Sequence, residues 1–296
     1  MSPLSRRAEH LALKPTAFYA AHAVYTQARS AWWDARTGGH AVAGGLRILF
    51  YHRVSRDRDE LAVTPDRFRE QMEHLAGSGY RVVGAVEAAA ALDNPGRNHV
   101  IGLTFDDGYQ DVADNALPVL AELGFRATIF LPTGAIDGTH PFSWYERSPP
   151  LLQWSTIVEL DRGGAVDFGA HTISHPNLLA LDDATAEREI AGSKEALEAR
   201  LGHAVASFCY PAGLHSERER RLVRAAGFRV AVGTDPGPND GDSNRLALRR
   251  IGVEPRDRLL DFRAKVGGGH DRAPPLRGVY RKIRFGSPPV SKRFSH

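Results

Sequence analysis

Residues 100–108 read VIGLTFDDG, an apolar run that ends in two adjacent carboxylates and a glycine. The first six residues have the length and composition of a buried strand in a parallel sheet. Successive strand side chains point to opposite faces. Asp106 and Asp107 can therefore share one site only if the chain turns there, and Gly108 permits such a turn. The alternative is an ordinary Asp-Asp-Gly turn that caps the next helix.

The same alternation of short apolar runs and helical segments continues on both sides. Repeated strand–helix units predict parallel strands with helices outside them. Seven or eight units in about 220 residues predict an α/β fold, a distorted (β/α)7-type barrel whose strand carboxyl ends form the active face. The predicted strands cover residues 46–51, 80–83, 100–105, 127–131, 165–170, 207–210, 228–232 and 246–253.

The 296 residues divide into three predicted parts. Residues 1–44 are an N-terminal helical extension and linker, residues 45–266 the barrel, and residues 267–296 a basic, flexible tail. The single cysteine, Cys209, excludes an intramolecular disulfide and is expected to be a buried structural thiol. No apolar secretion signal follows Met1. The predicted location is therefore cytoplasmic or at a membrane surface, or extracellular if the true start lies upstream.

Both ends of the chain have patterns with two interpretations. Phe18, Ala21, Tyr25, Ala28 and Trp32 recur at helical spacing and predict an amphipathic helix that packs on the barrel or contacts a membrane or partner. From residue 265 to the end the sequence has eight Lys/Arg and only one Asp. This excess of positive charge predicts either binding to an anionic surface or a solvated terminus. No nucleic-acid-binding module is recognisable, so no nucleic acid is expected as a partner.

Two imidazoles four residues apart, those of His171 and His175, follow the strand predicted at residues 165–170. With Asp107 they form a ligand set that holds a divalent metal and leaves positions open for water and substrate. Zinc, cobalt, nickel or iron would each suit this set. The alternative is a chance surface pair of histidines, which the Asp-Asp-Gly turn at another strand end disfavours.

The remaining chemistry can be assigned to residues that follow predicted strands. A cation nearby would keep Asp106 ionised, so that it can act as the base. His52 is the candidate acid for a leaving amine, the alternative being a structural histidine. The backbone N–H of Tyr210 is the expected donor to an oxyanion. In the loop predicted at residues 133–150, Phe142 and Trp144 are candidates for stacking on a sugar ring, or else form a packed lid.

These motifs resemble those of one enzyme family. TFDDGY at residues 104–109, HTISH at 171–175 and YPAG at 210–213 are similar to the first three motifs of the polysaccharide deacetylases, the NodB-homology or carbohydrate esterase family four enzymes. FYHRV at 50–54 and LRRIGV at 248–253 resemble one branch, in which a Tyr-His motif comes early in the chain. The resemblance covers roughly residues 46–254.

The resemblance implies a divalent metal, with zinc as the expected one, on Asp107, His171 and His175, and Asp106 as base. It implies removal of N-acetyl groups from amino sugars in a polymer. The third motif of the family usually opens with an arginine that orients the base, and Cys209 and Tyr210 occupy that place here. Arg250, or else Arg249, is the expected substitute. The late Leu-X-His motif is absent, which leaves the acid role to His52.

The sequence therefore predicts a metal-dependent hydrolase of carbon–nitrogen bonds, a carbohydrate N-deacetylase. The predicted substrate is an N-acetylhexosamine polymer of a cell wall or an exopolysaccharide. One alternative is a deacylase of an intracellular nucleotide- or lipid-linked amino sugar, which the missing export signal favours. The other is a catalytically degenerate protein that only binds glycan, which the missing third-motif arginine favours.

Overall fold

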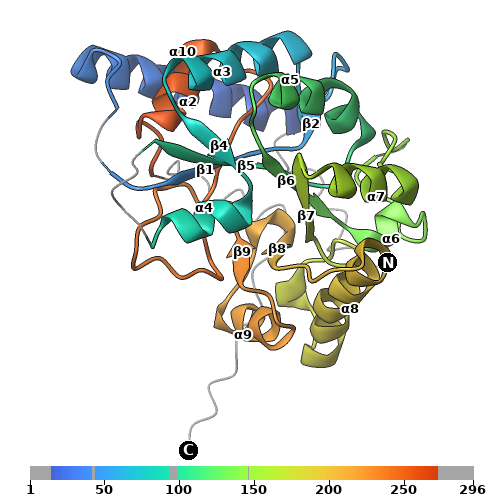
Figure 1. Cartoon of the computed structure of the whole chain (residues 1–296). Coiled ribbons are helices and arrows are strands. Elements are labelled where there is room, and N and C mark those ends of the chain that lie inside the picture. Colours follow the sequence, from blue (N-terminus) through green and yellow to red (C-terminus); the bar gives the residue numbers. More distant parts are fainter. Residues whose placement is uncertain (1–14, 42–43, 94–98, 146, 273–296) are drawn as a thin grey trace, which may run out of the picture.

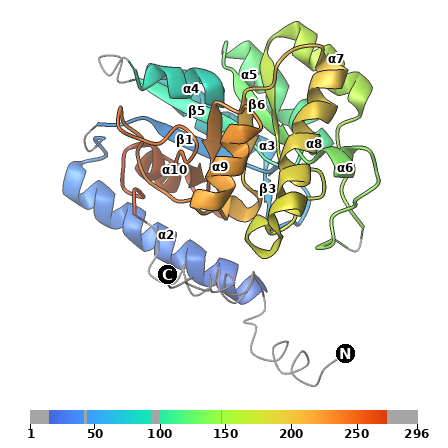
Figure 2. The same cartoon turned by 90° about the horizontal axis from the view of Figure 1, so that it is seen from below.

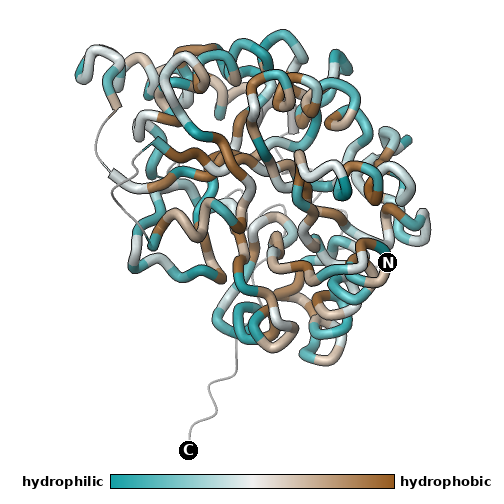
Figure 3. Tube along the Cα trace, in the orientation of Figure 1, coloured by the Kyte–Doolittle hydropathy of each residue, from teal (hydrophilic) through white to brown (hydrophobic). Residues whose placement is uncertain are grey.

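A curled sheet of parallel strands forms the centre of the structure (Figure 1), a computed structural model that describes residues 15–41, 44–93, 99–145 and 147–272. Helices cover the outside of the sheet, and the hydrophobic residues concentrate along the central strands (Figure 3). This architecture confirms the predicted distorted α/β barrel. The strands are β1 (Arg47–Tyr51), β4 (Arg81–Val83), β5 (Val100–Phe105), β6 (Ala127–Leu131), β7 (Val166–Ala170), β8 (Ser207–Cys209), β9 (Val230–Val232) and β10 (Ile251–Gly252).

The strands follow the order β10-β1-β5-β6-β7-β8-β9, and β4 pairs with the first half of β5. The segment before β10 connects the two edges of the sheet. Leu248 bridges to Val232 of β9, and Ile251 then pairs with Leu49 of β1. The single strand predicted at residues 246–253 is therefore wrong as a continuous element. The chain crosses from one edge to the other within it and pairs only briefly with each.

The helices begin and end at ordinary sequence signals. For example, Asp182 accepts a hydrogen bond from the Thr185 N–H at the start of α8, and Gly202 in the left-handed region (φ 77°) ends it. The helices are α2 (Pro15–Thr37), α3 (Pro65–Gly77), α4 (Ala85–Ala91), α5 (Leu117–Glu122), α6 (Thr133–Ile136), α7 (Trp154–Gly163), α8 (Asp183–Leu201), α9 (Glu217–Ala225) and α10 (Leu259–Val266), with the π-helical turn η1 (Val112–Ala116) and the 3-10 turns η2 (Leu178–Ala180) and η3 (Pro211–Gly213).

A small strand pair that the sequence did not indicate lies beside the active face. β2 (Arg53–Val54) pairs with β3 (Ala62–Val63) and closes the loop between them. The buried Arg53 guanidinium forms ion pairs with Asp59 and Asp111, at 2.7 and 2.8 Å. This loop forms one wall of the site described below.

Helix α2 packs against α10 (Figure 2), but not through the apolar stripe that the sequence suggested. The buried side chains are Ala23, Thr26, Ser30 and Trp33 on the opposite face, whereas Trp32 is 62% exposed. Packing through this stripe is therefore the wrong alternative, because polar Thr26 and Ser30 are buried on the other face among hydrogen bonds that hydropathy does not reveal. None of the described helices combines the length and apolarity that crossing a bilayer requires.

The packed part of the chain extends beyond the predicted boundary at residue 266. Arg47 holds Asp271 in a two-pronged ion pair, and His270 is buried against Ser30. Lys265, the first of the eight basic residues counted above, is buried and bonded to Asp257. Residues 1–14 and 273–296, which carry the rest of the basic ends, lie outside the described residues.

Candidate active site

The chain turns immediately after β5, and this turn brings the two carboxylates together. Asp107 and Gly108 both lie in the left-handed region, with φ of 74° and 70°. A side chain at position 108 would be strained by this positive φ, and its Cβ, 2.6 Å from Leu131 Cδ2, would force the Leu131 side chain to move. The turn thus breaks the strand alternation, and Asp106 and Asp107 both line the same cavity at the carboxyl ends of the strands.

Asp107 meets the two predicted histidine ligands. Its Oδ1 lies 3.6 Å from His171 Nε2 and 3.7 Å from His175 Nε2. Ligand atoms about 2.1 Å from a tetrahedral ion lie about 3.4 Å from one another, close to these separations. Among the described residues Asp107 Oδ1 has no hydrogen-bond partner although it is buried. A buried carboxylate oxygen without a partner is rare, and its presence here fits a divalent cation held by the three side chains.

The protonation of these three groups also suits a cation. Burial lowers the pKa of His171 to about 4 and, with the neighbouring His171 charge, lowers the pKa of His175 well below its usual range. Both imidazoles are therefore neutral at neutral pH, as metal ligands must be. Burial and the Asp106 charge raise the pKa of Asp107 to about 8. A bound cation would reverse that shift and release the proton.

The histidine-bearing loop is held by Glu189 of α8, a residue that the sequence reasoning missed. Glu189 Oε2 accepts hydrogen bonds from the N–H groups of Ile173 and Ser174, both at 2.9 Å, and Oε1 accepts one from Ser174 Oγ at 2.6 Å. His175 itself has a φ of 56°. A strained ligand loop of this kind needs such supports. The sequence offered no signal beyond an acidic residue near the start of a helix.

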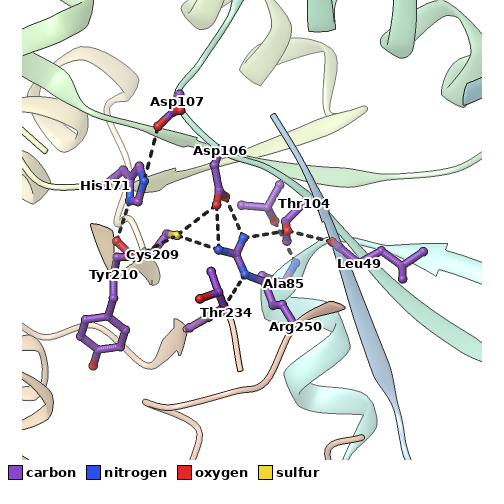
Figure 4. A network of polar contacts seen from close by, with 12 residues as sticks. Leu49, Ala85, Thr104, Asp106, Asp107, His171, Cys209, Tyr210, Thr234 and Arg250 are labelled. Atoms are coloured by element: carbon purple, nitrogen blue, oxygen red, sulfur yellow. Dashed lines mark hydrogen bonds and ion pairs between the residues drawn. The ribbon is translucent and has the colours of Figure 1, made fainter. Parts of the chain in front are cut away.

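The Arg250 guanidinium lies between Asp106, Thr104 and Cys209 (Figure 4). Its Nη1 and Nη2 donate to the two oxygens of Asp106 at 2.7 and 2.8 Å, and the side chain is fully buried. Burial opposes ionisation of Asp106, but the guanidinium outweighs it and holds the pKa of that carboxyl well below its usual range. Arg250 rather than Arg249 thus occupies the position expected for a base-orienting arginine, although it comes from the far end of the chain.

Cys209 is buried, as predicted, and it also belongs to the site. Its Sγ lies 3.0 Å from Arg250 Nη2, and its carbonyl accepts a 2.7 Å hydrogen bond from His171 Nδ1. That bond leaves His171 Nε2 free to face Asp107. The assignment of the Tyr210 N–H to an oxyanion is wrong, because that N–H donates to the Val232 carbonyl in the β8–β9 ladder.

A cavity of about 1340 Å³ opens above these groups. His52 lines it together with Asp106, Asp107 and both histidines. Burial lowers the pKa of His52 below its ordinary value. The loop between β2 and β3 forms one wall, and residues 143–145 and 147–150 form another. The volume exceeds what one small molecule needs and suits several sugar units.

The two aromatic candidates have different positions. Trp144 lines the cavity, is 39% exposed, and places its ring edge-on to His175 at 5.0 Å. Phe142 is buried and stacks behind Trp144, with ring centroids 4.4 Å apart. The assignment of Phe142 as a substrate contact is therefore wrong, since it supports Trp144 and does not reach the cavity lining. Tyr145 fixes the same loop through its hydroxyl bond to Asp59, at 2.6 Å.

Comparison with known sequences agrees with the fold and the motifs. A profile described as polysaccharide deacetylase matches residues 93–231. YxkH of Bacillus subtilis (strain 168), provisionally named a polysaccharide deacetylase, is 30% identical over 212 residues, which cover 71% of this chain and 72% of YxkH. The poly-beta-1,6-N-acetyl-D-glucosamine N-deacetylase of Staphylococcus aureus (strain MRSA252) is 20% identical over 215 residues, 69% of this chain and 72% of that protein.

Solved structures share the fold. IcaB from Ammonifex degensii matches with a TM-score of 0.67 at 25% identity, over 78% of this chain and 98% of IcaB. The deacetylase PplD of Streptococcus pyogenes, solved in complex with acetate, matches with a TM-score of 0.66 at 23% identity, over 76% of this chain and 99% of PplD. Fold and motifs together define a hydrolase that removes N-acetyl groups from carbohydrate. The chain belongs to the polysaccharide deacetylase family.

Proposed function

We propose that this protein is a metal-dependent N-deacetylase of N-acetylhexosamine polymers. The observation that carries the proposal is the partnerless Oδ1 of buried Asp107, which faces two neutral imidazoles. Directly beside it stands Asp106, kept ionised by Arg250. The IcaB and Staphylococcus aureus relatives favour poly-β-1,6-N-acetylglucosamine as the first substrate to test.

A divalent cation on Asp107, His171 and His175 would polarise the acetyl carbonyl and acidify a water molecule. The Asp106 carboxylate accepts the proton of the attacking water, since Arg250 keeps this carboxylate charged and fixes its orientation. Both Arg250 bonds to Asp106 are charge-assisted and bidentate, which limits rotation of the base.

His52 donates the proton that the departing amine needs. It reaches the cavity from the end of β1, the strand next to β5. Its lowered pKa leaves His52 mostly neutral at neutral pH and makes its imidazolium a stronger proton donor. The proton that Asp106 has taken from water would pass to His52 and from there to the amine, so that hydrolysis yields acetate and a free amine and restores both side chains. Trp144 offers the exposed ring on which a sugar can stack, backed by Phe142.

The two alternatives differ in their support. A degenerate, glycan-binding protein was favoured by the missing third-motif arginine, but Arg250 supplies the equivalent charge to Asp106. The intracellular nucleotide- or lipid-linked substrate stays an alternative, and the location of the protein stays a prediction.

Elemental analysis of the purified protein, combined with acetate release, tests the proposal. We expect one divalent metal per chain, zinc first. Acetate release should be faster from β-1,6-linked N-acetylglucosamine oligomers than from a UDP-linked or lipid-linked N-acetylhexosamine. Asp106→Asn should retain the metal and lose acetate release. Full activity after complete metal removal would refute the metal site, and preference for the nucleotide- or lipid-linked sugar would support the alternative.

A further inference from the structure

The outward face of α2 is an apolar surface that nothing in the described residues covers. Three large apolar side chains are exposed in the described part of the chain, and two of them, Val24 at 67% and Trp32 at 62%, lie on this helix. The third, Trp144, belongs to the cavity. Ala21 and Ala28 are also exposed and fall on the same helical face. We call Ala21, Val24, Ala28 and Trp32 the α2 stripe.

The opposite face of α2 holds the helix firmly, so the α2 stripe keeps its outward direction. Trp33 packs against Gly267 and Gly269, so closely that a Cβ on Gly267 would lie 2.4 Å from its ring. Arg29 donates to the carbonyls of Gly269 and Arg272, at 2.6 and 2.7 Å. The helix lies along the edge of the molecule beside α10 (Figure 2).

Positive charge accompanies the α2 stripe. Arg36 is exposed in the last turn of the same helix, and its guanidinium lies 5.5 Å from the centre of the Trp32 ring. Residues 1–14 and 273–296 together contain nine Lys/Arg and one Glu, which leaves 29 Lys/Arg and 34 Asp/Glu in residues 15–272. Both basic segments join the described structure at α2, one before Pro15 and the other after Arg272, which Arg29 holds.

We propose that the α2 stripe rests in the interfacial layer of a membrane that contains anionic lipids. Tryptophan favours the headgroup level of a bilayer, and small apolar side chains beside it enter the acyl boundary. The nine Lys/Arg that the sequence carries before Pro15 and after Arg272 add electrostatic attraction of the chain to a negative surface. This inference is independent of the proposed function, since it uses no residue of the cavity.

A second copy of the chain fits this surface less well. Stable interfaces bury about 800 Å² on each partner, and a single stripe of two large side chains and two alanines is narrow for that. Association through α2 would also bring two sets of basic segments together, with charge repulsion. An anionic surface has the opposite charge and no such conflict.

Cosedimentation of the full chain with lipid vesicles tests the inference. We expect binding to phosphatidylcholine vesicles with about one third phosphatidylglycerol, little binding to phosphatidylcholine alone, and weakening as salt is raised. The double variant Val24→Ser, Trp32→Ala should lose at least about tenfold in affinity, because both side chains leave the interface. Trp144→Ala, which removes the other exposed large apolar ring, is the matched control and should bind like the unaltered protein.

Circular dichroism and thermal unfolding show whether the double variant is folded, as expected for exposed positions. Equal vesicle binding by the double variant and the unaltered chain would overturn the proposal, since the basic segments alone would then suffice. Absence of binding to anionic vesicles would also overturn it. A dimer of the unaltered protein that the double variant converts to a monomer would assign the α2 stripe to self-association instead.

Discussion

Replacement of Arg250 by methionine removes the only cation that directly contacts Asp106 among the described residues. Breaking a buried ion pair by removal of one partner costs about 3–5 kcal/mol, because the remaining charge is left without compensation. Asp106 is 4% exposed, so little water can take the place of the guanidinium. We expect the free energy of unfolding, measured by urea denaturation, to fall by about that amount.

The double variant Arg250→Met, Asp106→Asn separates stability from catalysis. With the carboxylate gone, the cost of the missing guanidinium should largely disappear, so the two stability changes will be strongly non-additive. Acetate release should be lost in the double variant and should fall at least about 100-fold in Arg250→Met, because the base loses its orientation. Arg250→Lys keeps the charge but not the two-pronged contact, so its stability should exceed that of Arg250→Met while activity stays low.

The pH profile gives a second readout. Without Arg250, burial would raise the pKa of Asp106, and the acid limb of activity in Arg250→Met should move to higher pH. In the unaltered protein Asp106 has a lower pKa when folded than when unfolded. Its ionisation therefore stabilises the fold at pH values above the unfolded pKa, and this contribution is lost as the pH falls through the pKa of the folded protein. Additive stability changes in the double variant, or full acetate release by Arg250→Met, would refute the reasoning.

Three further predictions concern the ligands and the cavity. Because the pKa of Asp107 is raised to about 8, zinc binding should displace most of one proton from this carboxyl at pH 7 and less as the pH rises above 8. Calorimetry in buffers of different ionisation enthalpy measures this release, and a release that does not fall over this range would contradict the prediction. Glu189→Ala should weaken zinc affinity about 10- to 100-fold by loosening the histidine loop, with exposed Glu187→Ala on the same helix as control. Trp144→Ala should raise KM for sugar oligomers about 3- to 10-fold with a smaller change in kcat, and an unchanged KM would remove Trp144 from the binding surface.

Local patterns of hydrophobic and turn-forming residues were sufficient to predict most of the helices and strands. The strands predicted at residues 100–105 and 127–131 have the predicted bounds. These features depend on residues a few positions apart, whose periodicity and turn chemistry are readable in one dimension. The ligand set was accessible for a similar reason, since parallel strands bring their carboxyl ends to one face.

Contacts between segments that are far apart in the sequence could not be predicted from local patterns. The sequence suggested Arg250 only as a substitute for a missing arginine, and its pairing with Asp106 joins positions 144 residues apart. Hydropathy also did not predict three other contacts: the support that Glu189 gives to the histidine loop, the hydrogen bond from the Tyr210 N–H to a strand carbonyl, and the face of α2 that is buried. The amino-acid sequence determined which segments form strands and which side chains have metal-binding chemistry. Only the tertiary structure decided which polar groups meet, because a hydrogen bond depends on positions in space that no local pattern encodes.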